Sequence, residues 1–142
     1  MDNIIFCKTW QDNDVIELKA KCLSSVATVT SRIYVSDCLI DELIWQIKQF
    51  LDGNNEEGYW ANEDKGNTST ACLSLRFFRK DKLGHIIIEV FAEIDDGGDY
   101  TKHNCCFFIN TEYGLLMKFC EELAQLKKNP VGYKIHLSGS LS

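Results

Sequence analysis

The chain has 142 residues with 15 basic and 21 acidic side chains, a formal net charge of -6, and 45% apolar residues. This length suits one domain with its own hydrophobic core, and the apolar content excludes a mainly disordered chain. No apolar run approaches the roughly 20 residues that cross a bilayer, so no membrane partner is expected. The net acidity argues against direct binding of nucleic acid, because such proteins carry a basic patch. We expect a single α+β domain over residues 1–142, with a loose tail at 138–142.

The N-terminus and the cysteines both indicate a cytoplasmic protein. The first residues lack the cationic start of a secretory signal. The seven cysteines are an odd number scattered through apolar segments, which is typical of thiols that stay reduced. We therefore expect buried free cysteines rather than a disulfide framework.

Three strands are predicted in the first third of the chain. Apolar and polar side chains alternate with a period of two over 15–23 and 26–35, and a short apolar run covers 4–10. The connections between these segments have only two to four residues, too short for a parallel crossover. The pattern predicts an antiparallel meander.

Two amphipathic helices are predicted from apolar residues spaced three and four apart. The first spans 37–52, with Ser36 or Asp37 as its N-cap. The second has Thr111 as its expected cap and runs to about Lys128. Each helix has one apolar stripe to bury against a sheet.

A second β region lies between and after the helices. The alternation patterns predict strands at 72–79, 86–94, 103–110 and 133–137, and Tyr59-Trp60 is a candidate short strand. Together the elements predict a two-layer α+β domain, with a mostly antiparallel sheet of about six strands and two helices on one face.

The sequence lacks the motifs of common enzyme and metal chemistry. It contains no G-x-S-x-G, no P-loop, no G-x-G-x-x-G after a strand and no H-E-x-x-H. His103, Cys105 and Cys106 are close in sequence, but in a strand Cys106 points away from the other two, and no C-x-x-C supplies further ligands. We expect no metal site, no cofactor and no catalytic residues.

The acidic residues are unevenly distributed. Ten of the 21 lie in the segments 52–64 and 89–99, neither of which contains a lysine or an arginine. The first segment also contains Tyr59 and Trp60, and aromatic residues are typical of binding hot spots. An acidic surface of this kind attracts a basic protein partner, whereas acidic runs can equally be solvated loops. The candidate partner-binding residues are Asp52, Glu56, Glu57, Tyr59, Trp60, Glu63, Asp64, Glu89, Glu93, Asp95, Asp96 and Asp99.

Several sequence motifs over about residues 36–128 resemble one protein family. They are the helix entry at Ser36-Asp37, the helix end Phe50-Leu51, the strand start Gly84-His85 continuing through Val90, the run Cys106 to Thr111 and the helix Leu115 to Leu126. In this pattern the chain resembles the small immunity proteins that protect bacteria from contact-delivered polymorphic toxins of the Wap type. At Asn110-Thr111-Glu112 it differs from the family's usual acidic residue and glutamine.

The resemblance implies a non-catalytic cytoplasmic inhibitor that binds a cognate nuclease toxin and blocks its active site or substrate surface. The resemblance assigns no individual binding residue, because such proteins diversify at the interface. Combined with the acidic segments, it leads us to expect an immunity protein whose acidic face docks on a basic toxin domain.

Two alternatives come from other functional classes. One is a small-ligand or regulatory binding domain that uses the outer face of the sheet. Its groove would be lined by Phe78, Phe91 and Phe108. The other is an enzyme in which His85 or His103 pairs with the carboxylate of Glu89 or Glu93 in a cleft.

Overall fold

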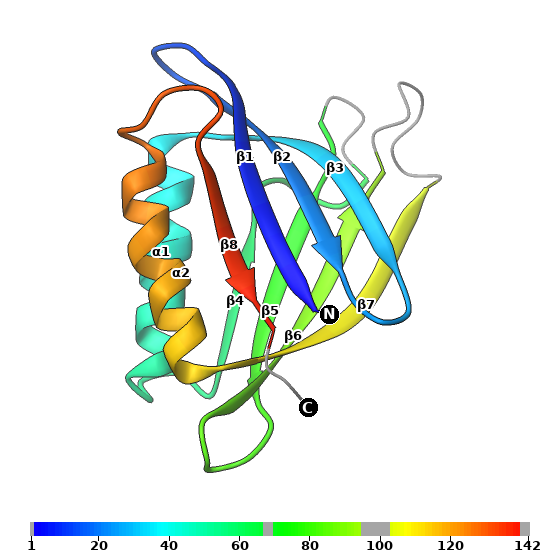
Figure 1. Cartoon of the computed structure of the whole chain (residues 1–142), viewed down its shortest axis with the longest axis vertical. Coiled ribbons are helices and arrows are strands. Elements are labelled where there is room, and N and C mark those ends of the chain that lie inside the picture. Colours follow the sequence, from blue (N-terminus) through cyan, green and yellow to red (C-terminus); the bar gives the residue numbers. More distant parts are fainter. Residues whose placement is uncertain (1, 67–69, 95–102, 140–142) are drawn as a thin grey trace.

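The computed structural model describes residues 2–66, 70–94 and 103–139, which form two α-helices and two four-stranded antiparallel sheets (Figure 1). The predicted α+β class is confirmed. The prediction of one sheet of about six strands was wrong, since eight strands divide between two sheets. Each sheet has one apolar face. These two faces point toward each other and are buried in one continuous core.

The first sheet, called sheet A, has the strand order β3-β2-β1-β8. Its strands are β1 (Asn3–Gln11), β2 (Ile16–Leu23), β3 (Thr28–Val35) and β8 (Lys134–Ser138). The predicted meander of β1, β2 and β3 is confirmed, and β8 returns from the end of the chain to pair with β1.

The second sheet, called sheet B, has the strand order β4-β5-β6-β7. Its strands are β4 (Glu57–Ala61), β5 (Leu73–Arg79), β6 (His85–Glu93) and β7 (Asn104–Glu112). The candidate short strand at Tyr59-Trp60 is therefore confirmed as β4, which forms one edge of this sheet.

Helix α1 (Asp37–Leu51) begins as predicted at Ser36, whose hydroxyl accepts a hydrogen bond from the Leu39 backbone N–H at 3.2 Å. Gly53 follows the helix with a φ of 81°, a left-handed conformation that glycine adopts without strain. The buried stripe of the helix consists of Ile40, Leu43, Ile47, Phe50 and Leu51.

Helix α2 (Tyr113–Leu126) has Glu112 at its N-cap position, one residue later than predicted. Thr111 does not cap it, because Thr111 still pairs with Ile86 in the β6–β7 ladder. Its hydroxyl donates instead to the Ser138 carbonyl at 3.0 Å, which ties the end of β7 to β8 of the other sheet. Within the described residues, neither helix has the length and apolarity needed to cross a membrane.

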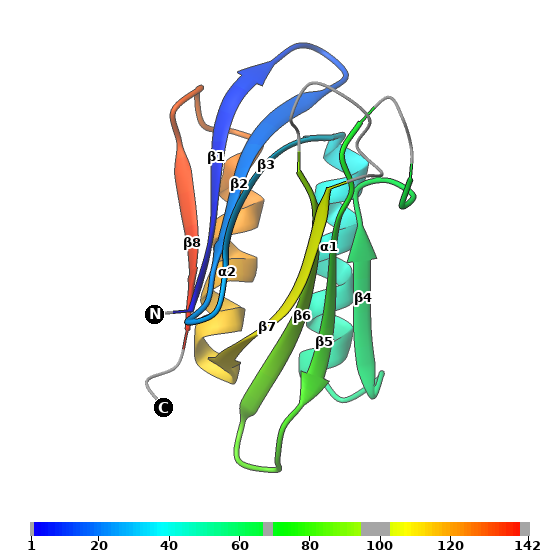
Figure 2. The same ribbon diagram turned by 90° about the vertical axis from the view of Figure 1, so that its right-hand side faces the viewer.

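The two helices lie side by side along one open side between the sheets (Figures 1 and 2). Helix α2 packs on sheet A through a Phe6–Phe119 edge contact at 5.7 Å, and α1 packs on sheet B through Phe50–Phe77 at 6.0 Å. On the opposite side, the Ser31 hydroxyl of β3 joins the sheets by donating to a β6 carbonyl at 2.7 Å. Neither helix covers the outer face of either sheet (Figure 2).

Candidate protein-docking surface

The two neighbouring aromatic side chains of edge strand β4 lie on opposite faces of sheet B. Tyr59 is 40% exposed, whereas Trp60 is only 1% exposed and its indole N–H donates to the Leu39 carbonyl at 2.9 Å. Since side chains alternate across a strand, only one of the pair can face solvent. Trp60 was therefore wrong as a surface anchor, and it joins β4 to α1 inside the core.

Glu93 is also buried, although the sequence predicted it as a docking residue. It is 2% exposed, and its two carboxylate oxygens accept the backbone N–H groups of Cys72 and Gly66, each at 2.8 Å. These bonds hold the segment before β5 against the end of β6. Glu93 thus has a structural role and presents no charge to a partner.

The acidic residues that flank β4 line two cavities, one of which includes Tyr59. A cavity of about 390 Å³ is lined by Tyr59 and by carboxylates from α1 and the loop after β4, namely Glu42, Glu63 and Asp64. A neighbouring cavity of about 500 Å³ is lined by residues that include Glu56, Glu57, Phe78 and Arg79. We call the residues Glu42, Glu56, Glu57, Tyr59, Glu63 and Asp64 the β4 surface. Asp52, also exposed, lies at its margin beside Gly53 of the second cavity.

A base from the next strand moderates this acidic character. Arg76 of β5 lies between Glu57, 3.5 Å away, and Glu89 of β6, 3.8 Å away. Its guanidinium also lies over the Tyr59 ring, 4.5 Å from the ring centroid. The two segments without a base in the sequence therefore share an arginine in space. The cavities retain an acidic balance, since their lining contains five carboxylates against Lys65 and Arg79.

Sequence reasoning missed two exposed residues on α1. Glu42 lines the first cavity, and Trp45, 54% exposed, follows one turn later on the same helix. Both positions lie off the buried stripe of α1, and a tryptophan off the stripe was the signal available in the sequence.

The aromatic groove expected for a small-ligand domain is not formed by the residues proposed for it. Phe108 is 54% exposed on β7, Phe91 lies beneath the Lys65 ammonium at 4.4 Å, and Phe78 lines the second cavity. None of the four principal cavities of the described structure contains two of these rings.

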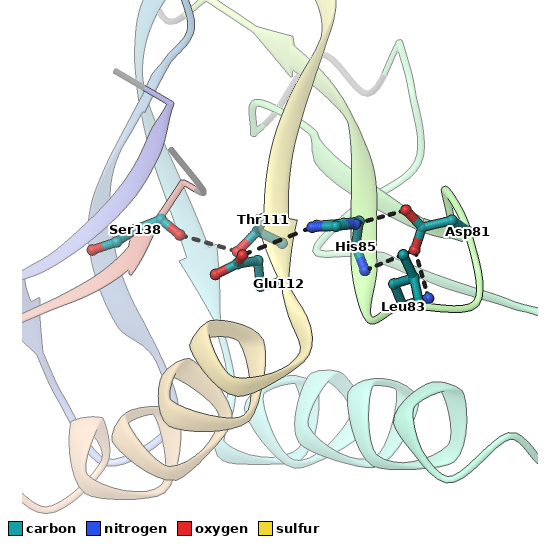
Figure 3. Close-up of polar contacts among 6 residues, drawn as sticks. All are labelled: Asp81, Leu83, His85, Thr111, Glu112 and Ser138. Atoms are coloured by element: carbon teal, nitrogen blue, oxygen red, sulfur yellow. Dashed lines mark hydrogen bonds and ion pairs between the residues drawn. The ribbon is translucent and has the colours of Figure 1, made fainter. Parts of the chain in front are cut away.

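His85 has carboxylate neighbours, but they differ from the two that the sequence suggested. Its Nδ1 lies 2.6 Å from Asp81 Oδ2, and its Nε2 lies 4.0 Å from Glu112 Oε1 (Figure 3). The hydrogen bond with His85 holds the pKa of Asp81 below its usual value, and a backbone bond from Leu83 adds to this effect. Glu89 faces Arg76 instead.

Three further residues were predicted to be part of the site. Asp95, Asp96 and Asp99 fall outside the described residues. Within the described ranges, no group of three or more His, Cys, Asp and Glu side chains is arranged to hold a metal ion.

Comparisons with known proteins give little sequence similarity. No family model and no curated protein matches the chain, so its resemblance to Wap-type immunity proteins stays a prediction. A solved structure that does match is a chain of the "CdiA-CT/CdiI toxin and immunity complex from Enterobacter cloacae". The match covers 85% of this chain and 97% of that chain, with 7% identity and a TM-score of 0.48. This similarity does not establish membership of a family.

Proposed function

We propose that this protein is a non-catalytic immunity protein that binds and neutralises a toxin domain with a basic surface. The observation that carries the proposal is the β4 surface, where five carboxylates line two cavities along one edge strand and the exposed Tyr59 lines one of them. The resemblance of residues 36–128 to Wap-type immunity proteins supports the same role.

The proposed mechanism is occlusion. A nuclease toxin has a basic surface that holds nucleic acid phosphates, and the carboxylates of the β4 surface take the place of those phosphates. Complementary charge accelerates association and disfavours partners of the wrong sign, while a few anchors supply most of the affinity. Tyr59 is the aromatic anchor, because its ring is exposed and Arg76 holds it in place. This role requires no cofactor and places the protein in the cytoplasm with the toxin's substrate.

The test is co-expression with the C-terminal domain of the cognate toxin, which under this proposal the neighbouring gene encodes. The wild-type chain should restore growth and bind the domain, and binding should weaken as salt rises. The triple variant Glu42→Lys, Glu63→Lys, Asp64→Lys should bind at least about 30-fold more weakly and fail to protect. Tyr59→Ala should weaken binding about tenfold or more.

The matched control reverses charge elsewhere. Lys19→Glu with Lys21→Glu changes two exposed cations on the outer face of sheet A and should leave protection intact. If the triple variant protects as well as the wild type, docking through the β4 surface is wrong. If the wild type neither binds nor protects, the immunity role toward that toxin is wrong.

A further inference from the structure

A cavity of about 380 Å³ lies where the end of α1 and the start of α2 approach the β5–β6 hairpin. It shares Arg79 with the second cavity described above but contains none of the carboxylates of the β4 surface. Its floor is apolar and consists of Phe50, Leu51 and Ile86, which are 0%, 7% and 3% exposed. A cavity of this size with a buried apolar floor is within the range of small-molecule sites.

Two polar groups at the rim have no partner within the described structure. Lys82 is exposed in the hairpin, and Tyr113 is 42% exposed at the first position of α2. Both line the cavity, and neither side chain makes a hydrogen bond or an ion pair with a described residue. One ammonium and one phenolic hydroxyl are thus available to a ligand that enters the cavity.

The other charged groups at the rim are already engaged. Asp81 accepts the Leu83 backbone N–H at 2.7 Å through one oxygen and contacts His85 Nδ1 at 2.6 Å through the other (Figure 3). The Arg79 guanidinium lies 4.4 Å from the centroid of the Phe50 ring and donates to the Phe50 carbonyl. The Asp81 carboxylate thus has hydrogen-bond partners within the hairpin, whereas the Lys82 ammonium has none among the described residues.

We propose that this cavity binds a small anion with a flat apolar body, such as an aromatic carboxylate. The ring lies on the apolar floor, and the carboxylate receives hydrogen bonds from the Lys82 ammonium and the Tyr113 hydroxyl. Apolar lining with a few converging polar groups is the usual composition of such sites, and a charged hydrogen bond fixes the ligand's orientation.

The test is a titration of the ¹⁵N-labelled protein with 1-naphthoate, followed by amide chemical shifts. We expect the amides of Gly84, His85 and Tyr113 to shift, with a Kd of about 1 mM or tighter for a ligand of this size. Lys82→Gln should weaken binding about tenfold, because it removes a charged hydrogen bond. Lys80→Gln is the matched control, since Lys80 lies in the same exposed hairpin but does not line the cavity.

Three outcomes would overturn the proposal. One is the absence of shifts at the cavity, and another is equally tight binding of the neutral analogue 1-naphthamide. The third is an equal loss of affinity in Lys80→Gln, which would reduce the effect to general surface charge. Each result is independent of toxin binding, which depends on other residues and has its own assay.

Discussion

The outer faces of the two sheets differ in charge although both are bare. On sheet A, Cys7 pairs with Lys19 and Lys134 in neighbouring strands, and Lys19 pairs with Arg32, so three cations from β2, β3 and β8 lie in one row, where Arg32 is 4.0 Å from Glu17. Sheet B and its flanking loops carry the carboxylates of the β4 surface and the exposed Tyr59 and Phe108 rings. A net charge of -6 therefore conceals a separation of charge between two faces.

The charge of a binding surface is therefore a local property, which the net charge of the chain does not reveal. The chain is acidic in total, yet a short row of cations crosses the outer face of sheet A. The buried charges differ in the same sense, since β1 of sheet A buries Lys8 and β6 of sheet B buries Glu93.

The largest difference in stability is expected between alanine variants of the two aromatic residues of β4, of which one is in the core and one on the surface. Trp60→Ala should lower the free energy of unfolding by about 3–5 kcal/mol, because it empties a fully buried site and removes the bond to Leu39. Tyr59→Ala should lower it by about 1 kcal/mol or less, since only an exposed ring and its contact with Arg76 are lost. Urea denaturation measures both values. Similar losses in the two variants would contradict the assignment of one ring to each face.

The buried charges of the two sheets should each be needed for stability. Lys8 Nζ donates to the carbonyls of Asn129 at 2.7 Å and Lys127 at 3.3 Å, which lie at the end of α2. We expect Lys8→Met and Glu93→Gln each to cost about 2–3 kcal/mol, because methionine cannot donate to the two carbonyls and glutamine accepts only one of the two N–H groups. Thermal and urea unfolding of both variants gives the comparison. A neutral effect of either change would show that water replaces the buried charge.

Alkaline pH should destabilise the protein through a buried thiol of sheet A. Burial raises the pKa of Cys22 to about 12, so the folded protein retains a proton that the unfolded chain releases near its ordinary value. The stabilisation from this thiol is fully present below the unfolded pKa and declines as pH rises toward the folded pKa. Between about pH 8 and about pH 10.5 the loss should be about 2 kcal/mol. The Cys22→Ala variant should show a correspondingly smaller decline over that range, and an unchanged decline would contradict the assignment.

The smallest effect is expected at Arg76. Its ion pairs with Glu57 and Glu89 are partly exposed, so Arg76→Gln should change stability by less than about 1 kcal/mol. It should raise the association rate with a basic toxin domain, because the β4 surface becomes more acidic. Stopped-flow mixing at low salt measures this rate. A slower association would indicate that Arg76 serves the complex by holding Tyr59.

The sequence predicted most elements because their signals are local. The period of two identified β2 and β3, and the spacing of three and four identified α1 with its cap at Ser36. The start of α2 was misplaced because Thr111 has the chemistry of a cap. Its hydroxyl instead bonds Ser138, which no local pattern can reveal.

The candidate site was only partly predictable for the same reason. The acidic segment around β4 was visible in the sequence, and its Glu56, Glu57 and Asp64 are exposed. The side of each aromatic residue depends on the register of β4 with β5, and the burial of Glu93 depends on backbone groups more than 20 residues away in sequence.

The α+β class, the amphipathic elements and the acidic content around β4 could be predicted from the sequence, because they follow from periodicity and composition. Only the tertiary structure decided that the strands form two sheets, that Tyr59 rather than Trp60 faces outward, and that Arg76 lies between two acids. The cavity beside His85 also depends on the tertiary structure, because its lining residues come from α1, α2 and a hairpin. The physical reason is that strand pairing and helix packing join distant segments, whereas side-chain periodicity records only which face each segment buries.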